Sequence, residues 1–397
     1  MNSKFILFLL LGIDAFILLF QASHLSITSS EASILYGDTS FLQFLTQLSL
    51  QLFGHTNLGL RVFMILLHVM SALLIYLLSK AYVKQERNRL WLVLMFVLLP
   101  GSVSSALVVS HAGIIIFGLF LYIYLNQKLS QKYLNILLLF YLFIEPGFSY
   151  LFLSLSFYHL YKREKFNASY HFFLYLLSIY MNGFVAHGYP RGYFLDLLGV
   201  YSAIFTPIVF VYLFYVLYRR FLSKEFDKIW FISSVTLLIS LVLSFRQRIN
   251  LEYFAPYLMA ALPIAAQTFI SSYRVRLKVH RKKYKAMFVI SFVLLILNTL
   301  VVFFNKELYI FLKNPKKHFA YEMHIATELS QKLKKMGIKC VKTDVDMQKR
   351  LKFYKIGECD RNLLLELSLA SKKEADVTIS YKNKTLYKAD VTKINNK

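Results

Sequence analysis

The sequence predicts a polytopic α-helical membrane protein, with about eleven transmembrane helices in residues 1–304 and a soluble α/β domain in residues 305–397. Composition is the first reason, because 57% of the 397 residues are hydrophobic and only 17% are charged. Soluble domains contain roughly 45–50% apolar and 25% charged residues. The second reason is the distribution of apolar residues, which form one helix-length run after another until about residue 304.

The apolar runs define the expected spans. The first run follows Met1-Asn2-Ser3-Lys4, as in a signal peptide, but it is long and ends without a small-x-small cleavage site. We therefore expect an uncleaved first helix. The third to sixth runs are short, so these helices could tilt or pair as hairpins. The runs cover residues 5–22, 62–82, 90–108, 111–127, 133–145, 147–161, 169–186, 197–218, 229–245, 253–272 and 286–304.

The loops differ sharply in charge. The net charge is +25, from 46 Lys and Arg against 21 Asp and Glu. With eleven spans, one set of alternating loops carries basic clusters, at residues 84–89, 128–132, 162–165, 219–228 and 274–285. The other set holds only Arg61, Arg191, Arg246 and Arg248 as strong bases. The basic set is expected to be cytoplasmic, which places the N-terminus inside and the C-terminal domain outside. No nucleic-acid-binding motif accompanies the charge.

The C-terminal domain shows its own element pattern. Residues 319–336 fit a helix that ends at Gly337, and residues 338–345 read as a strand. Residues 351–356 form another element. Residues 375–379 and 385–391 predict a hairpin around Lys382-Asn383-Lys384. Cys340 and Cys359 are the two cysteines, and they could form one disulfide outside the cytoplasm or remain two separate buried thiols.

The first outer loop, residues 23–60, is the longest on its side and contains two carboxylates. Glu31 and Asp38 could each act as a general base toward an acceptor hydroxyl or amine. The alternative is a solvated acid or a helix cap. Within the same loop, polar residues recur near helical spacing in residues 41–53, so this segment could lie flat on the membrane.

Other polar residues also have two interpretations. Arg61, Arg191, Arg246 and Arg248 could bind a phosphate at the outer interface, because the guanidinium fork suits phosphate oxygens, or they could pair with lipid headgroups. Asp14 lies in the first span and should face protein or a wet cavity. The segment Glu145-Pro146-Gly147 indicates a tight outer turn.

Several functional classes lack support in the sequence. His24, His55, His111 and His187 map to the outer side, but their spacing fits no metal template. No Walker loop or dinucleotide-binding glycine pattern occurs, so we expect neither a cofactor nor an ATP-driven pump.

Several short motifs resemble the GT-C superfamily of membrane glycosyltransferases, in particular its branch of protein O-mannosyltransferases and lipid A aminoarabinose transferases. Glu31-Ala32 resembles part of the Asp-Glu-Ala motif that opens the first periplasmic loop of these enzymes, although Ser30 replaces the Asp. The order of the motifs along the chain also agrees with the family. The other matching segments are residues 52–61, Leu98-Leu99-Pro100-Gly101, Tyr253-Phe254-Ala255-Pro256 with Leu262-Pro263, and Leu351-Lys352-Phe353-Tyr354.

The resemblance implies transfer of a sugar from a polyprenyl-phosphate-linked donor to an acceptor on the outer face of the bacterial cytoplasmic membrane. The acceptor could be a lipid, a glycan or a protein. In this family a first-loop carboxylate is the base and basic residues hold the carrier phosphate, which here implies Glu31 or Asp38 and the four outer arginines. The sequence departs from the family at Glu252, where a basic residue is usual.

The sequence also allows two other functions. A transporter or flippase of lipid-linked saccharides would be favoured by paired halves with broken helices at corresponding positions, which the sequence does not show. A non-catalytic membrane protein with a GT-C-like fold, whose outer domain binds a partner, is the third interpretation.

Overall fold

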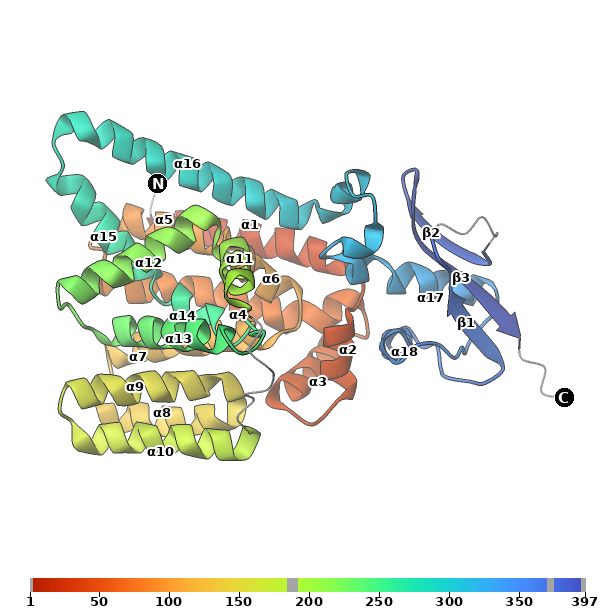
Figure 1. The fold of residues 1–397 in the computed structure, drawn as a ribbon, viewed down its shortest axis with the longest axis horizontal. Coiled ribbons are helices and arrows are strands. Elements are labelled where there is room, and N and C mark those ends of the chain that lie inside the picture. The colour runs from red at the N-terminus through yellow and green to blue at the C-terminus, as the bar shows by residue number, and fades with distance from the viewer. Residues whose placement is uncertain (1–2, 184–191, 370–374, 394–397) are drawn as a thin grey trace. The chain divides into compact units, whose positions relative to one another are not determined.

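The computed structural model describes residues 3–183, 192–369 and 375–393, which form a predominantly helical chain with a small sheet near its C-terminus (Figure 1). The chain divides into two compact units. Unit 1 comprises residues 1–18 and 63–299, and unit 2 comprises residues 19–62 and 300–397. The first outer loop therefore belongs to the same unit as the C-terminal residues.

Among the described residues, sixteen α-helices precede the C-terminal region in chain order. They are α1 (Ser3–His24), α2 (Ser29–Tyr36), α3 (Phe41–Phe53), α4 (Asn57–Leu78), α5 (Glu86–Val97), α6 (Pro100–Leu107), α7 (His111–Asn126), α8 (Gln131–Ile144), α9 (Ser149–Tyr161), α10 (Lys165–Asn182), α11 (Phe194–Phe205), α12 (Pro207–Leu222), α13 (Lys228–Ser244), α14 (Ala255–Met259), α15 (Leu262–Val275) and α16 (Lys278–Phe303). The short 3₁₀ turns η1 (Ser79–Ala81) and η2 (Pro146–Phe148) lie between them.

Prolines break two of the apolar runs in unit 1. Pro100 begins α6 after a bend of 59° from α5, and Pro207 begins α12 after a bend of 105° from α11. Proline lacks the backbone N–H that a continuing helix needs, but it fits the first turn of a new helix. The break at Leu98-Leu99-Pro100-Gly101 agrees with the family resemblance of this segment.

Fewer helices than expected are long enough to span a membrane alone. Within the described residues, three helical segments pass by length and composition, at Ser3–His24, Asn57–Ala81 and Val279–Phe303, or five if each bent pair is one span. Three shorter apolar helices are α7, α8 and α13. The expected number of eleven spans is thus not confirmed, because several runs form helices too short to cross a bilayer untilted.

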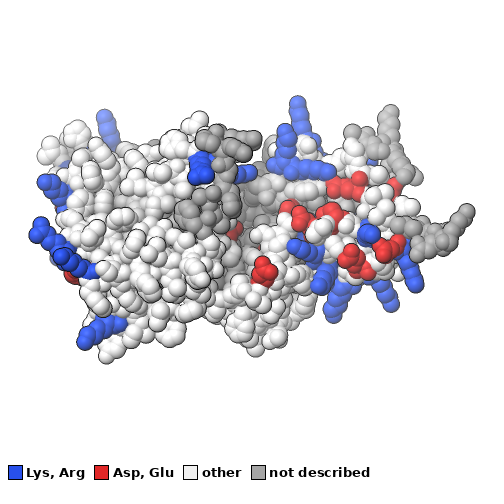
Figure 2. Space-filling model, turned by 60° about the horizontal axis from the view of Figure 1, so that its bottom comes forward, with Lys and Arg blue, Asp and Glu red and all other residues white. Residues whose placement is uncertain are grey.

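Unit 1 exposes the apolar surface that a membrane protein presents to lipid. α9 packs against α10 and α13, and α7 packs against α8 (Figure 1). Large apolar side chains such as Phe140 and Phe143 of α8 and Phe173 of α10 remain more than half exposed. A soluble monomer rarely exposes such a continuous apolar surface. Figure 2 shows this wide uncharged surface, with Lys and Arg gathered at one end of it.

Hydrogen bonds join several of the basic loops at that end of unit 1. Asp227 accepts from Arg220 at 3.0 Å and from the Tyr82 hydroxyl at 3.4 Å. The neighbouring Lys228 ammonium donates to Asn126 at 2.6 Å. The loops before α5, after α7 and between α12 and α13 therefore meet at one end, as a set of loops on one side of a membrane must.

The C-terminal part of unit 2 combines short helical turns with a three-stranded antiparallel sheet of order β1-β3-β2. α17 packs against both α18 and β2. α2, which follows α1 in the chain, packs against α18 and α3. The elements are η3 (Asn305–Ile310), η4 (Pro315–Lys317), η5 (Tyr321–His324), α17 (Ala326–Lys335), α18 (Val345–Phe353), β1 (Asn362–Glu366), β2 (Val377–Tyr381) and β3 (Lys384–Lys393).

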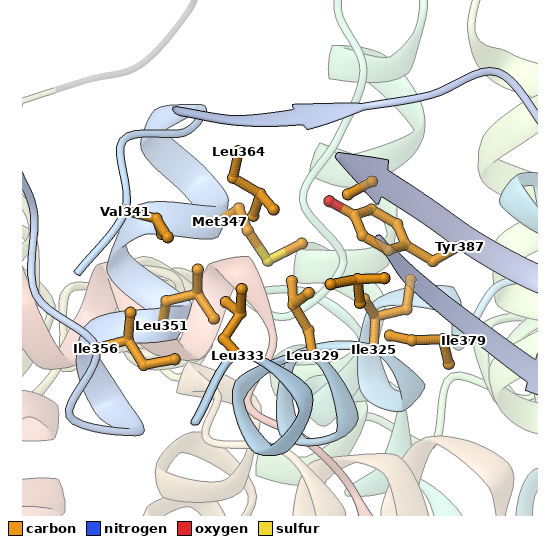
Figure 3. Close-up of a cluster of buried hydrophobic side chains, with 12 residues drawn as sticks. Ile325, Leu329, Leu333, Val341, Met347, Leu351, Ile356, Leu364, Ile379 and Tyr387 are labelled. Carbon is orange, nitrogen blue, oxygen red and sulfur yellow. The ribbon is translucent and has the colours of Figure 1, made fainter. Parts of the chain in front are cut away.

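A hydrophobic core holds this sheet to its helices. Most of the side chains come from α17, α18 and the three strands, and Figure 3 shows the labelled ones pointing toward one another. Burying each of these large side chains contributes roughly 1.5–3 kcal/mol. The core residues are Ile325, Leu329, Leu333, Val341, Met347, Leu351, Ile356, Leu364, Val377, Ile379, Tyr387 and Ala389.

In this region, one element predicted from the sequence is confirmed and the others differ from the structure. The hairpin is confirmed, with Lys382 in the left-handed region at φ 52° in its turn. Residues 338–345 are not a strand, because only isolated bridges form at Cys340 and Lys342. Most of residues 351–356 lie at or beyond the end of helix α18, not in a separate element. The α17 helix is shorter than predicted, because its first turns are the 3₁₀ segment η5.

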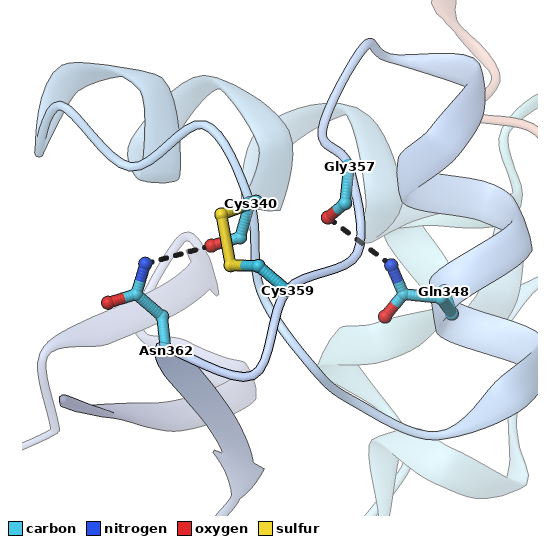
Figure 4. Close-up of a disulfide and its surroundings, with 5 residues drawn as sticks. All are labelled: Cys340, Gln348, Gly357, Cys359 and Asn362. Atoms are coloured by element: carbon cyan, nitrogen blue, oxygen red, sulfur yellow. Dashed lines mark hydrogen bonds between the residues drawn. A yellow bond between two sulfur atoms is a disulfide. The ribbon is translucent and has the colours of Figure 1, made fainter. Parts of the chain in front are cut away.

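Cys340 and Cys359 form a disulfide, which resolves the alternative that the sequence left open. The bond closes a loop between residues 19 positions apart. Asn362 donates to the carbonyl of Cys340 at 2.9 Å beside it (Figure 4). A crosslink over a loop of this length stabilises by about 3 kcal/mol in the chain-entropy model, and such bonds persist in oxidising compartments.

We predict a topology with the N-terminus inside and the C-terminus outside. An alkaline phosphatase fused after Lys397 should be active, and one fused near Lys283 should be inactive, because the enzyme needs an oxidising compartment. Maleimide labelling supplies an independent measurement. Cys340 and Cys359 should resist labelling in intact protein and react only after reduction. The reverse reporter pattern, with reactive thiols, would contradict the orientation.

Candidate functional site

The predicted base Glu31 lies in the first turn of α2. Thr28 caps this helix, because its hydroxyl accepts from the Glu31 backbone N–H at 3.1 Å. The Glu31 carboxylate accepts in return from the Thr28 backbone N–H at 2.9 Å. This reciprocal pair is a capping box, which satisfies two N–H groups at the helix start. The sequence Thr-Ser-Ser-Glu at 28–31 carries the signal for it.

Glu31 also forms a buried ion pair with the predicted phosphate ligand Arg61. Arg61 Nε lies 2.8 Å from Oε1 of Glu31, and Nη2 lies 2.6 Å from Oε2. Both residues have no exposed surface. The family resemblance implies that these two residues serve one site as base and phosphate ligand, and the structure brings them into direct contact with each other.

The remaining donors of Arg61 bind backbone carbonyls at the end of α1. Nη1 donates to Ala22 at 3.2 Å and to Leu25 at 2.7 Å, and Nη2 donates to Ser26 at 2.9 Å. A guanidinium has five N–H donors, and all are thereby used. In this arrangement Arg61 has no donor left for a phosphate. Its donor-binding role and the base role of Glu31 stay predictions that require this contact to open.

The segment after α1 is hydrogen-bonded to the C-terminal part of unit 2. The Ser26 backbone N–H donates to the Met323 carbonyl at 2.8 Å. The Ile27 N–H donates to the Tyr354 hydroxyl at 3.0 Å, and Glu322 accepts from the Ser29 N–H at 2.8 Å. Sequence reasoning missed these contacts, because partners some 300 positions apart leave no local pattern.

Arg350 of α18 strengthens this connection. Its Nε donates to the Ile27 carbonyl at 3.1 Å, and its Nη2 donates to the Glu322 carbonyl. The side chain is buried. Burial lowers the pKa of the Arg350 guanidinium, and the neighbouring Glu322 opposes that effect. Residues 22–31 are thus held by two buried arginines, Arg61 and Arg350.

The other predicted site residues lie elsewhere. Asp38 is exposed in the bend between α2 and α3. Arg246 and Arg248 are exposed in the loop of residues 245–254, which belongs to unit 1. Arg191 lies outside the described residues. A meeting of these arginines with Glu31 therefore stays a prediction.

Asp14 of α1 faces protein, as expected for a carboxylate in an apolar helix. Its Oδ2 lies 3.0 Å from Nε2 of His68 in α4. The Nδ1 atom of the same imidazole lies 3.3 Å from the Ser102 hydroxyl of α6. This contact ties three apolar helices together and satisfies polar groups that would be costly in lipid.

A second histidine–carboxylate pair lies at the turn that the sequence indicated. Glu145 precedes η2, and its Oε2 lies 2.9 Å from Nδ1 of His111, the first residue of α7. Glu252 lies close to the same histidine. Burial raises the pKa of the Glu252 carboxyl, while the imidazole and backbone amide of His111 lower it. The sequence indicates a turn at Glu145 but not this contact, because the partner histidine lies 34 positions away.

Neither cluster has the arrangement of a metal centre. Throughout the described ranges, no group of three or more His, Cys, Asp or Glu is arranged to hold a metal ion. The chemistry available to these side chains is proton transfer and hydrogen bonding to a substrate.

The comparisons with known proteins show the fold. No protein-family model matches the sequence, and no curated protein matches it. The crystal structure of ArnT from Cupriavidus metallidurans in the apo state is similar to this chain. The two are 12% identical and align over 90% of this chain and 86% of that chain, with a TM-score of 0.56. The chain accordingly has a GT-C-like fold.

We predict that Glu31→Gln destabilises the protein. The substitution leaves the Arg61 charge buried without its counter-ion, which costs about 3–5 kcal/mol. The melting temperature of purified protein in detergent should fall clearly, and Glu31→Gln combined with Arg61→Met should recover part of the loss.

Asp38→Asn is the matched control, because Asp38 is exposed and its substitution should change stability by about 0.5 kcal/mol or less. A Glu31→Gln protein with unchanged melting temperature would contradict the structural role, and loss of sugar transfer in that same protein would favour a catalytic carboxylate.

Proposed function

We propose that this chain transfers a sugar from a polyprenyl-phosphate-linked donor to an acceptor on the outer face of the bacterial cytoplasmic membrane. The observation that carries the proposal is the GT-C-like fold, which extends over 90% of the chain. Apolar helices and clustered basic loops support a membrane location. ArnT, which has a solved structure similar to this chain, is a lipid A aminoarabinose transferase of this fold.

The proposed reaction exchanges one bond at the sugar. The bond between the anomeric carbon and a phosphate oxygen breaks, and the same carbon binds an acceptor oxygen or nitrogen. Polyprenyl phosphate leaves with its negative charge, and the acceptor loses one proton. The protein therefore needs a cation for the phosphate and a base for the proton.

Arg246 and Arg248 are the best candidates for the phosphate among the described residues. Both are exposed and lie in loop 245–254, directly after the apolar helix α13. A guanidinium at this position can reach a lipid phosphate at the interface. Arg61 is less suitable, because its five donors bind Glu31 and backbone carbonyls.

A flippase for lipid-linked saccharides is the rival function. The two bent pairs, α5–α6 and α11–α12, favour it, because broken helices are common at transport sites. The bends differ, at 59° and 105°, which is not what two equivalent halves would show.

Reconstituted vesicles separate the two functions. Full-length protein in proteoliposomes should convert a panel of labelled polyprenyl-phosphate sugars into free polyprenyl phosphate and sugar-modified acceptor, with lipid A, glycan and peptide acceptors supplied separately. A flippase would move the labelled lipid between leaflets and leave the sugar–phosphate bond intact. If the labelled lipids moved between leaflets and the sugar–phosphate bond of every donor stayed intact, the proposal would be contradicted.

The two arginines give a prediction about donor binding. Arg246→Ala with Arg248→Ala should weaken donor binding roughly ten- to a hundredfold for each lost contact, because a charge-assisted hydrogen bond is worth about 1.5–3 kcal/mol. Arg87→Ala is the control, since Arg87 is exposed in the first turn of α5, at the other end of unit 1. Equal donor affinity in the double variant and the control would exclude these arginines.

A further inference from the structure

Three helices of unit 1 carry polar groups to the end opposite the basic loops. α7 and α8 meet the basic end through Asn126 and Gln131, both of which accept from Lys228 at the start of α13. α7 has 16 residues and is therefore about 24 Å long. His111 at its start, Glu145 after α8 and loop 245–254 after α13 consequently lie at the other end.

The His111–Glu145 contact orients the imidazole. When Glu145 is ionised it can only accept hydrogen bonds, so Nδ1 of His111 donates to its Oε2. In the neutral form of this imidazole, Nε2 then carries the lone pair that can accept a proton. The His111 side chain is 23% exposed, whereas that of Glu145 is 1% exposed. The buried carboxylate thus orients a histidine that solutes can reach.

A second observation indicates a ligand at this pair. Oε1 of Glu145 is buried and has no hydrogen-bond partner among the described residues. A buried carboxylate oxygen without a donor is costly, and such groups are rare in native proteins. The hydroxyl or ammonium group of a substrate is the kind of donor that would satisfy it.

Loop 245–254 brings further groups to the same place. The Tyr253 ring lies 5.2 Å from the His111 imidazole, measured between ring centroids. Glu252 lies near the backbone amide of His111 at the start of α7. The loop that contains Arg246 and Arg248 therefore ends next to the His111–Glu145 pair.

We propose that His111 is the general base of this chain, that Glu145 is the residue that positions it, and that the acceptor is a hydroxyl or amine bound beside them. This assignment rests on the proposed glycosyl transfer. It places the base in unit 1 with Arg246 and Arg248, instead of at Glu31, whose oxygens are bound by Arg61 and Thr28.

The step balances without another reactant. The acceptor oxygen or nitrogen attacks the anomeric carbon, and its proton passes to Nε2 of His111. The carbon–oxygen bond to the phosphate breaks, and its electron pair leaves with polyprenyl phosphate. Glu145 stabilises the imidazolium that forms and stays ionised. Release of the proton to water returns the histidine to its starting state.

The test measures turnover by full-length protein reconstituted in vesicles with labelled polyprenyl-phosphate sugars. His111→Ala should lower turnover by roughly 10²- to 10⁴-fold and leave donor binding unchanged. Added imidazole should restore part of the lost turnover, which a purely structural histidine would not allow. Glu145→Asp should keep more turnover than Glu145→Gln, because the carboxylate is needed to orient the ring.

The chain offers a matched control at the basic end of unit 1. His159 Nδ1 lies 2.7 Å from Oε2 of Glu164, so this pair has the same form as His111–Glu145. His159→Gln should keep wild-type turnover. Wild-type turnover in His111→Ala would overturn the assignment. A loss of turnover in His111→Ala that imidazole does not restore, and that His159→Gln shows equally, would also overturn it. A wild-type protein that cleaves no donor would instead defeat the proposed function itself.

Discussion

The fold of unit 2 depends on the buried ion pair between Arg61 and Glu31. Its position explains why two charges are tolerated there. Arg61 lies at the carbonyl end of α1, where a helix dipole favours a cation, and Glu31 lies in the first turn of α2, where it favours an anion. Burying either charge alone would cost several kcal/mol. The pair therefore fixes where α1 ends and how α2 begins, and with them the course of the first outer loop.

This constraint changes which polar groups are available for chemistry. The first-loop carboxylate that resembles a catalytic motif is bound on both oxygens, and Arg350 and Tyr354 hold the preceding backbone in place. The polar groups at Glu145 in unit 1 differ from those at Glu31. One buried carboxylate oxygen of Glu145 has no hydrogen-bond partner among the described residues, and the neighbouring His111 is partly exposed. Polar groups whose hydrogen bonds are all made within the protein suit a structural role. A polar group without a hydrogen-bond partner, beside an accessible base, suits a role in binding a substrate.

The sequence predicted features that depend on local pattern. Charge clusters identified loops that meet at one end of unit 1, and alternation around Lys382 identified the hairpin. It did not predict the helix breaks fully, because Pro207 lies within an apolar run that reads as one span. It could not show that Arg61 and Glu31 bind each other, since both positions fit a catalytic motif equally well. The pairing of His111 with Glu145 depends on tertiary packing of α7 and α8, which no spacing rule reveals.

A structure of the full-length protein with bound polyprenyl phosphate would show which residues hold the phosphate. We predict phosphate density beside loop 245–254, within reach of Arg246 or Arg248 and close to His111, while Arg61 still contacts Glu31. Phosphate density on Arg61, with Glu31 released from the guanidinium, would contradict this assignment and return the catalytic role to the first outer loop.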